Sequence, residues 1–260
     1  FSLDFEDGET IHVIATWHPH VFGKHHQVRE IDSTNAELLR GDYSSGDSIV
    51  AQIQTEGRGR HGNQWQDHSR SFKGSWMLNP SSITQISSKK QIEVAYEIHR
   101  AFCSEQIHLQ TMHTKWPNDL LVRRENEKLW RKCGGILFQS YSKGMEQRIV
   151  IGIGLNTSAQ SLSPGQGCLE EINMAKTPSE LFMILNAVIG SLFELKQDLP
   201  PSTNHPNLEL NSVLKECLYR NKICVLVAVN EQAIVLSDQS GNRFSIENDD
   251  ELNWTNLHPQ

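Results

Sequence analysis

Apolar residues recur at helical spacing in two stretches of the chain. Residues 89–102 predict an amphipathic helix, since the apolar side chains fall on one face. The positions on that face are Ile92, Ala95, Ile98 and Phe102. Residues 178–195 predict a longer helix with six apolar residues in register, and Thr177 can cap its N-terminus.

A shorter helix is predicted near residue 34, where Ser33 or Thr34 can serve as the cap. Thr34 and Glu37 also have the spacing of a capping box. Runs rich in β-forming residues predict strands elsewhere. These runs are residues 10–16, 47–53, 74–78 and 148–155, with a strand–turn–strand region over residues 120–140.

The C-terminal part of the chain is separated by a stretch rich in Pro, Ser and Asn at residues 198–207, which we interpret as a linker. Three short β-type runs follow it, at residues 222–229, 233–237 and 243–247. We therefore predict a main domain over residues 28–200, a small β domain over residues 208–260, and an N-terminal extension over residues 1–27.

The composition is typical of a soluble globular protein, with 37% hydrophobic and 21% charged residues among 260. The net charge of −7 argues against general binding to nucleic acid. No apolar run approaches the roughly 20 residues that span a bilayer, and the acidic first ten residues do not resemble a signal peptide. Five cysteines without a C-x-x-C pair favour a reducing cytoplasm over a disulfide framework. Four histidines in residues 17–26 are interpreted as loop residues and not as a metal site.

A glycine-rich segment, GRGRHG at residues 57–62, matches the spacing of a dinucleotide-binding loop. That interpretation fails because no helical pattern follows the third glycine. Glycines still allow close approach of the backbone to a ligand, and Arg58 and Arg60 add positive charge. The segment predicts an anion-binding lid, with an ordinary solvated loop as the alternative.

Two further segments place polar or charged side chains beside residues that shape the backbone, a proline in one and a glycine pair in the other. In KWPND, Pro117 fixes the turn that presents Asn118 and Asp119, and Asp119 can bind Mg²⁺ or orient Lys115. A plain β-turn explains the same residues. Lys132 precedes a glycine pair that enters a strand, which suggests a cation in a site; a soluble hairpin tip is the alternative.

The order of these motifs resembles the catalytic domain of biotin protein ligases, over about residues 28–195. The resemblance rests on QTEGRGRHGNQW from Gln54 to Trp65, KWPND, KCGGIL from Lys132 and GIGLN ending at Asn156. It implies an α+β fold with a mixed sheet backed by helices, akin to class II aminoacyl-tRNA synthetases, and a small C-terminal SH3-like β domain.

The resemblance also implies an activity. Such enzymes use ATP and Mg²⁺ to form biotinyl-5′-AMP and then transfer biotin to a lysine of a carboxylase carrier domain. No membrane or nucleic-acid partner is expected, no helix-turn-helix pattern precedes the catalytic region, and a homodimer is left open.

The roles implied for single residues follow the same motifs. The residues implied to bind biotin are Ser33, Thr34, Asn35, Gln54, Gly57, Arg58, Gly135, Gly152 and Gly154. Those implied to bind the nucleotide are Arg60, Trp65, Lys115, Asn118, Lys132 and Asn156. Lys132, Arg58 and Arg60 are the implied catalytic residues, and Asp119 is the implied Mg²⁺ ligand.

Two departures from the family pattern leave alternatives open. The stretch between Asp119 and Lys132 is longer than expected, so Lys128 competes with Lys132 for the catalytic role. Glu56 replaces the usual alanine and adds negative charge near the anion site. The alternatives are a lipoate or octanoate ligase or transferase, and a non-catalytic biotin-binding paralogue.

Overall fold

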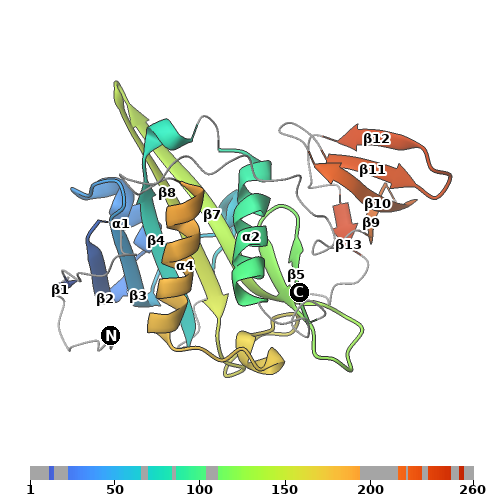
Figure 1. The fold of residues 1–260 in the computed structure, drawn as a ribbon, viewed down its shortest axis with the longest axis horizontal. Helices are drawn as coiled ribbons and strands as arrows, with labels where there is room; N and C mark the ends of the chain where they lie inside the picture. The colour runs from blue at the N-terminus through green and yellow to red at the C-terminus, as the bar shows by residue number, and fades with distance from the viewer. Residues whose placement is uncertain are drawn as a thin grey trace.

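The protein is described here from a computed structural model. The structure describes residues 12–14, 23–65, 70–83, 86–103, 111–193, 216–220, 222–229, 234–246 and 252–254. Within these residues the chain forms an eight-stranded mixed sheet and a separate five-stranded antiparallel sheet (Figure 1). The predicted α+β fold, with a mixed sheet backed by helices and a small C-terminal β unit, is confirmed.

The large sheet has the strand order β1-β2-β3-β4-β8-β7-β6-β5. Its only parallel pair among the described strands is β2 with β3. Its strands are β1 (His12–Ile14), β2 (His25–Ile31), β3 (Ser48–Gln54), β4 (Ser71–Leu78), β5 (Met112–Lys115), β6 (Asp119–Val122), β7 (Arg131–Lys143) and β8 (Glu146–Asn156).

The predicted strands of the main domain are present, with shifted ends. The strand expected at residues 10–16 is described only over His12–Ile14, and β4 begins three residues before the predicted start. β2 and β5 had no clear apolar signal. In β2 the polar residues His25, His26 and Gln27 are buried, so alternation of apolar and polar residues does not identify it.

Two long helices, α2 (Ser88–Phe102) and α4 (Pro178–Leu192), pack side by side on one face of the large sheet (Figure 1). The predicted apolar face of α2 is buried in the main core. Thr177 caps α4 as predicted, and Glu180 completes a capping box. Burial of these apolar faces stabilises both helices.

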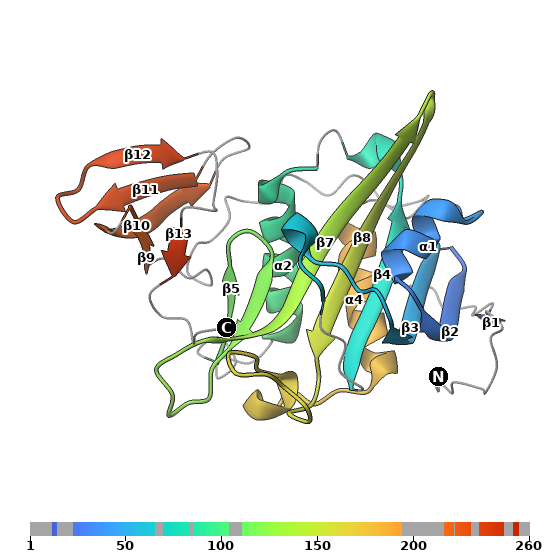
Figure 2. The same ribbon diagram turned by 180° about the vertical axis from the view of Figure 1, so that it is seen from behind.

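The short helix α1 (Thr34–Arg40) lies on the opposite face of the sheet (Figure 2). Its cap is Ser33, whose side chain accepts a hydrogen bond from the backbone of Ala36. The predicted capping box from Thr34 to Glu37 is wrong because Thr34 is already inside the helix, and Glu37 instead pairs with Arg40 at 2.6 Å.

Three short 3₁₀ turns complete the described main unit: η1 (Arg60–Gly62), η2 (Pro80–Ser82) and η3 (Leu169–Ile172). The small sheet has the order β12-β11-β10-β9-β13. Its strands are β9 (Glu216–Tyr219), β10 (Lys222–Val229), β11 (Ile234–Asp238), β12 (Arg243–Ile246) and β13 (Leu252–Trp254). Three of them match the predicted runs, whereas the predicted linker at residues 198–207 lies outside the described residues. Among the described helices, none has the length and apolar character to cross a membrane.

Candidate active site

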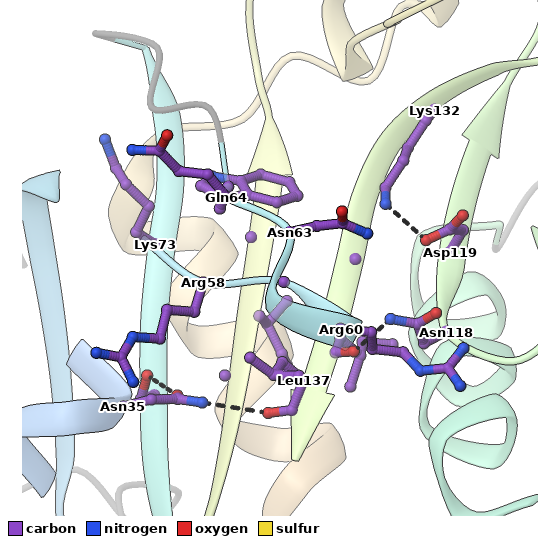
Figure 3. A pocket seen from close by; sticks show the side chains of 18 of the residues that line it. Asn35, Arg58, Arg60, Asn63, Gln64, Lys73, Asn118, Asp119, Lys132 and Leu137 are labelled. Atoms are coloured by element: carbon purple, nitrogen blue, oxygen red, sulfur yellow. Dashed lines mark hydrogen bonds and ion pairs between the residues drawn. The ribbon is translucent and has the colours of Figure 1, made fainter. Parts of the chain in front are cut away.

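A cavity of about 300 Å³ lies beneath the glycine-rich loop (Figure 3). The loop crosses the α1 face of the large sheet (Figure 2). Segments far apart in the sequence line the cavity: the start of α1, the end of β3, the loop, the middle of β4, the turn between β5 and β6, the first part of β7 and the middle of β8. The predicted site residues that line it are Ser33, Thr34, Asn35, Gln54, Arg58, Arg60, Trp65, Lys115, Asn118, Asp119, Lys132, Gly135, Gly152 and Gly154. The sequence motifs therefore converge on one hollow.

The floor of the cavity is open because two glycines of β8 face it. A Cβ at Gly152 would lie 2.3 Å from Oδ1 of Asn35, and a Cβ at Gly154 would lie 2.7 Å from the Trp65 ring. Real side chains do not approach so closely, so Asn35 and Trp65 can occupy these positions only over glycine. At Gly135 the nearest atom would be 3.6 Å away, which is an ordinary contact.

One wall of the cavity is a network of hydrogen bonds between α1, β3 and β4. Gln54 Oε1 accepts from the backbone N–H of Thr34 at 2.8 Å and from its hydroxyl at 3.0 Å. The Thr34 and Ser75 hydroxyls lie 2.7 Å apart, and Ser75 donates to Asn35 Oδ1 at 2.6 Å. Asn35 in turn donates to Gln139 at 2.8 Å. The network holds these groups in fixed directions, so they are ready to bind a polar ligand.

The opposite wall carries two ammonium groups that share one carboxylate. Lys132 Nζ lies 2.8 Å from Asp119 Oδ1, and Lys115 Nζ lies 2.9 Å from Asp119 Oδ2. Burial of Asp119 favours its neutral form, but Lys132 and Lys115 outweigh that effect and hold the pKa of the carboxyl below its usual value. Asp119 therefore stays ionised and fixes both cations beside the cavity, and Figure 3 shows its pair with Lys132.

The glycine-rich loop crosses the cavity and adds two guanidinium groups. Backbone hydrogen bonds close the loop on itself, from Gly59 N–H to Asn63 O at 2.7 Å and from Trp65 N–H to Gly57 O at 2.9 Å. In Figure 3, Arg58 lies toward Asn35, and Arg60 lies toward Asn118 on the other side. The Arg58 and Arg60 side chains thus border opposite parts of the hollow.

This arrangement can bring two anions together, because it places cations around a polar, glycine-floored cavity. In comparison with known proteins, the model of the biotin/lipoate A/B protein ligase family matches residues 27–156, which is half of the chain. The chain belongs to this family.

Curated relatives match about half of the chain. A biotin–[acetyl-CoA-carboxylase] ligase of Paracoccus denitrificans is 30% identical over 142 residues, covering 54% of this chain and 55% of that protein. A bifunctional ligase/repressor BirA of Salmonella typhimurium is 35% identical over 133 residues, covering 48% of this chain and 38% of that protein. The matched regions thus span about half or less of these relatives.

Solved structures share the fold over most of the chain. A biotin protein ligase from Aquifex aeolicus in complex with biotin and ATP has a TM-score of 0.64 at 20% identity, covering 88% of this chain and 97% of that one. A biotin acetyl coenzyme A carboxylase synthetase from Helicobacter pylori with bound biotinylated ATP has a TM-score of 0.54 at 17% identity, covering 85% and 99%. At these identities the likeness describes the fold alone.

The insertion between Asp119 and Lys132, where this chain departs from the family pattern, is held to the body of the protein. Arg131 pairs with Glu171 at 2.7 Å and with Glu127 at 2.8 Å, and Arg124 pairs with Glu171 at 2.5 Å. Lys128 is exposed in this insertion and does not line the cavity, whereas Lys132 does. The geometry therefore favours Lys132 over Lys128 for contact with a ligand.

Three residues singled out from the sequence do not line this cavity. Gly57 and Glu56 border a second hollow of about 670 Å³ along the same loop. Gly57 lies against Trp65, since a Cβ there would be 3.2 Å from Trp65 Cβ. The side-chain amide of Asn156 donates to Gly167 O at 3.2 Å. The implied contacts of Gly57 with biotin and of Asn156 with the nucleotide stay predictions.

The sequence reasoning missed Lys73 and Ser75, which line the cavity from β4. A signal was present in the alternation of β4: Lys73, Ser75 and Met77 face α1, while Phe72, Trp76 and Leu78 enter the main core. The predicted strand began only at residue 74, and so Lys73 was outside it.

Asp119 does not fit the role of a Mg²⁺ ligand as it stands, because each of its oxygens already pairs with an ammonium group. The part of the chain that the structure describes also contains no group of three His, Cys, Asp or Glu side chains that could hold a metal. Mg²⁺ commonly binds through nucleotide phosphates and only one or two carboxylates. A requirement for Mg²⁺ thus stays a prediction, in which the ion would bind mainly through the nucleotide phosphates.

Proposed function

We propose that this protein is an ATP-dependent biotin–protein ligase. The observation that carries the proposal is the convergence of Arg58, Arg60 and Lys132, from two distant segments, on one cavity with a polar wall and a glycine floor. A ligase of this kind must bring a carboxylate against a triphosphate, and cations in a secluded pocket offset the repulsion between them.

The first step of the proposed reaction joins the two substrates. A carboxylate oxygen of biotin attacks the α-phosphorus of ATP, the bond from that phosphorus to the bridging oxygen breaks, and pyrophosphate leaves with the electron pair. Lys132 and the two arginines would stabilise the negative charge that develops in this step. Asp119 supports the proposal because it holds the Lys132 ammonium at 2.8 Å on the cavity rim.

In the second step a lysine amine of the acceptor attacks the acyl carbon of biotinyl-5′-AMP. The bond from that carbon to the phosphate oxygen breaks, AMP leaves, and the amine loses a proton. The loop from Gly57 to Trp65 would shield the mixed anhydride from water, and Trp65 would pack against adenine. The acceptor we propose is the carrier domain of a biotin-dependent carboxylase, as the name of the Paracoccus relative suggests.

Biotin is favoured over lipoate because the far end of the cavity is polar. Thr34, Gln54 and Ser75 offer donors and acceptors that suit a ureido ring, whereas a dithiolane ring has no such groups. A site built from hydrogen-bonding groups rejects a ligand that leaves them unpaired. A cytoplasmic location is proposed as well, since all five cysteines are free and buried.

Pyrophosphate release measured with biotin, lipoate or octanoate as the only acid tests the proposal. We expect release that depends on biotin and ATP together, and calorimetry should show saturable biotin binding at micromolar concentration. Release with lipoate or octanoate instead would identify the other branch of the family. Biotin binding without any pyrophosphate release would identify a non-catalytic binder.

A further inference from the structure

The large sheet opens between β3 and β4 at the level of the cavity. The two strands pair only from Ser48 with Trp76 to Val50 with Gly74. Beyond that point β3 continues to Gln54 paired with β2, while β4 stays paired with β8 as far as Ser71. The described ends of β3 and β4 therefore separate, and the space between them belongs to the polar wall.

Lys73 bridges this opening. Its side chain is almost fully buried, with 1% exposure, and its ammonium donates to the backbone carbonyl of Gln52 at 2.5 Å. That carbonyl lies on the part of β3 that no longer pairs with β4. A side-chain hydrogen bond thus takes the place of a ladder hydrogen bond, and a bond from a charged donor is among the stronger ones.

The bridge is one side of a closed ring of contacts. Gln54 lies two residues after Gln52 on β3 and accepts from Thr34. Thr34 reaches the Ser75 hydroxyl, and Ser75 lies two residues after Lys73 on β4. β4 therefore holds the wall at two points, one through Ser75 and one through Lys73.

We propose that Lys73 is a positioning residue that sets Gln54, and through it Thr34, for recognition of the biotin ring. The inference rests on the proposed function and adds to it a determinant of biotin affinity outside the family motifs. Lys73 and Lys132 lie on opposite sides of the cavity (Figure 3). Loss of the Lys73 ammonium should thus weaken binding of the ring and leave the nucleotide side unchanged.

Calorimetry with biotin alone tests this proposal on Lys73→Met, which keeps the length of the side chain and removes its charge. We expect the Kd for biotin to rise about tenfold, which corresponds to about 1.4 kcal/mol. The KM for ATP at saturating biotin and kcat should change less than about twofold. Lys73→Arg, which can still donate to the Gln52 carbonyl, should restore biotin affinity to within about threefold of the wild type.

Lys143 is exposed, so Lys143→Met makes the same chemical change on the surface. Its biotin affinity should equal that of the wild type. If Lys73→Met does not fold, Lys73→Gln is compared with Lys73→Arg. The Gln side chain is shorter and uncharged, so its bond to the Gln52 carbonyl is weaker, and biotin affinity should fall in Lys73→Gln alone. Unchanged biotin affinity, or equal losses for biotin and ATP that Arg does not restore, would overturn the role of Lys73. If the wild-type protein bound no biotin, both the proposed function and biotin as the ligand of this wall would be overturned.

Discussion

Replacement of Lys132 by alanine removes one cation from the rim of the cavity and leaves the fold intact. The Lys132 side chain is 29% exposed, and its described ion pair is the one with Asp119 at 2.8 Å. Asp119 keeps Lys115 at 2.9 Å as its second partner, so the carboxylate does not become a buried, unpaired charge. We therefore expect a loss of stability of only about 1 kcal/mol.

The loss of activity should be much larger. A preorganised donor directed at developing charge is worth about 3–4 kcal/mol, or roughly a hundred- to a thousandfold in kcat. Adenylate formation, followed as pyrophosphate release at saturating biotin and ATP, should fall by that factor in Lys132→Ala. Biotin affinity measured without ATP should change by less than about threefold, because the polar wall lies on the other side of the cavity (Figure 3).

Lys128→Ala is the matched control, since Lys128 is exposed in the neighbouring insertion and does not line the cavity. Its pyrophosphate release should equal that of the wild type. If Lys128→Ala loses adenylate formation and Lys132→Ala keeps it, the assignment of the catalytic lysine is refuted. Equal small effects of both substitutions would refute the view that a lysine at this rim stabilises the developing charge.

Three further predictions concern the floor, the core and the insertion. Gly152→Ala should weaken biotin binding at least tenfold and cost about 1–3 kcal/mol of stability, because its Cβ would displace Asn35, whereas Gly135→Ala should be close to neutral in urea unfolding. Burial and neighbouring His26 lower the pKa of His25 to about 3, so the unfolded state alone takes up the proton between the usual pKa of 6.5 and that value. Stability should therefore decrease as the pH is lowered through this range, and the His25→Asn variant should lack about 1–2 kcal/mol of the loss between pH 6.5 and pH 5. Glu171→Gln should lower the urea midpoint by an amount equivalent to about 1–2 kcal/mol, because it weakens the pairing of two arginines; an unchanged midpoint would show that these pairs do not hold the insertion.

The helices could be predicted because their signals are local. In α2 the period of apolar residues alone identifies the buried face, and in α4 Thr177 identifies the start. The polar strand β2 gave no such signal, since its burial comes from its position between β1 and β3 and not from its side chains. Secondary structure that depends on neighbouring strands is not encoded in a single segment.

The candidate site divides in the same way. Motifs in which cationic residues and glycines are neighbours in the sequence could be recognised, and these motifs contain Arg58, Arg60 and Lys132. The pairing of Asp119 with Lys115 was one of the alternatives that the KWPND motif offered, but its pairing with Lys132 could not be derived, because it depends on the register that sets Asp119 of β6 opposite Gly135 of β7. A carboxylate that follows a proline turn has several ordinary roles, and only the neighbouring strand decides among them.

The glycines of β7 and β8 explain why the site lies on this face of the sheet. In β8 glycine alternates with apolar residues, so one face enters the main core while the other is bare, and Gly135 of β7 continues the bare face. The sequence IGIGL contains this alternation, but it does not say what covers the bare face. α1 and the glycine-rich loop cover it from distant parts of the chain, and they bring Asn35 and Trp65 onto the positions that Gly152 and Gly154 leave open. The cavity therefore arises from strand periodicity, which is local, combined with chain topology, which is not.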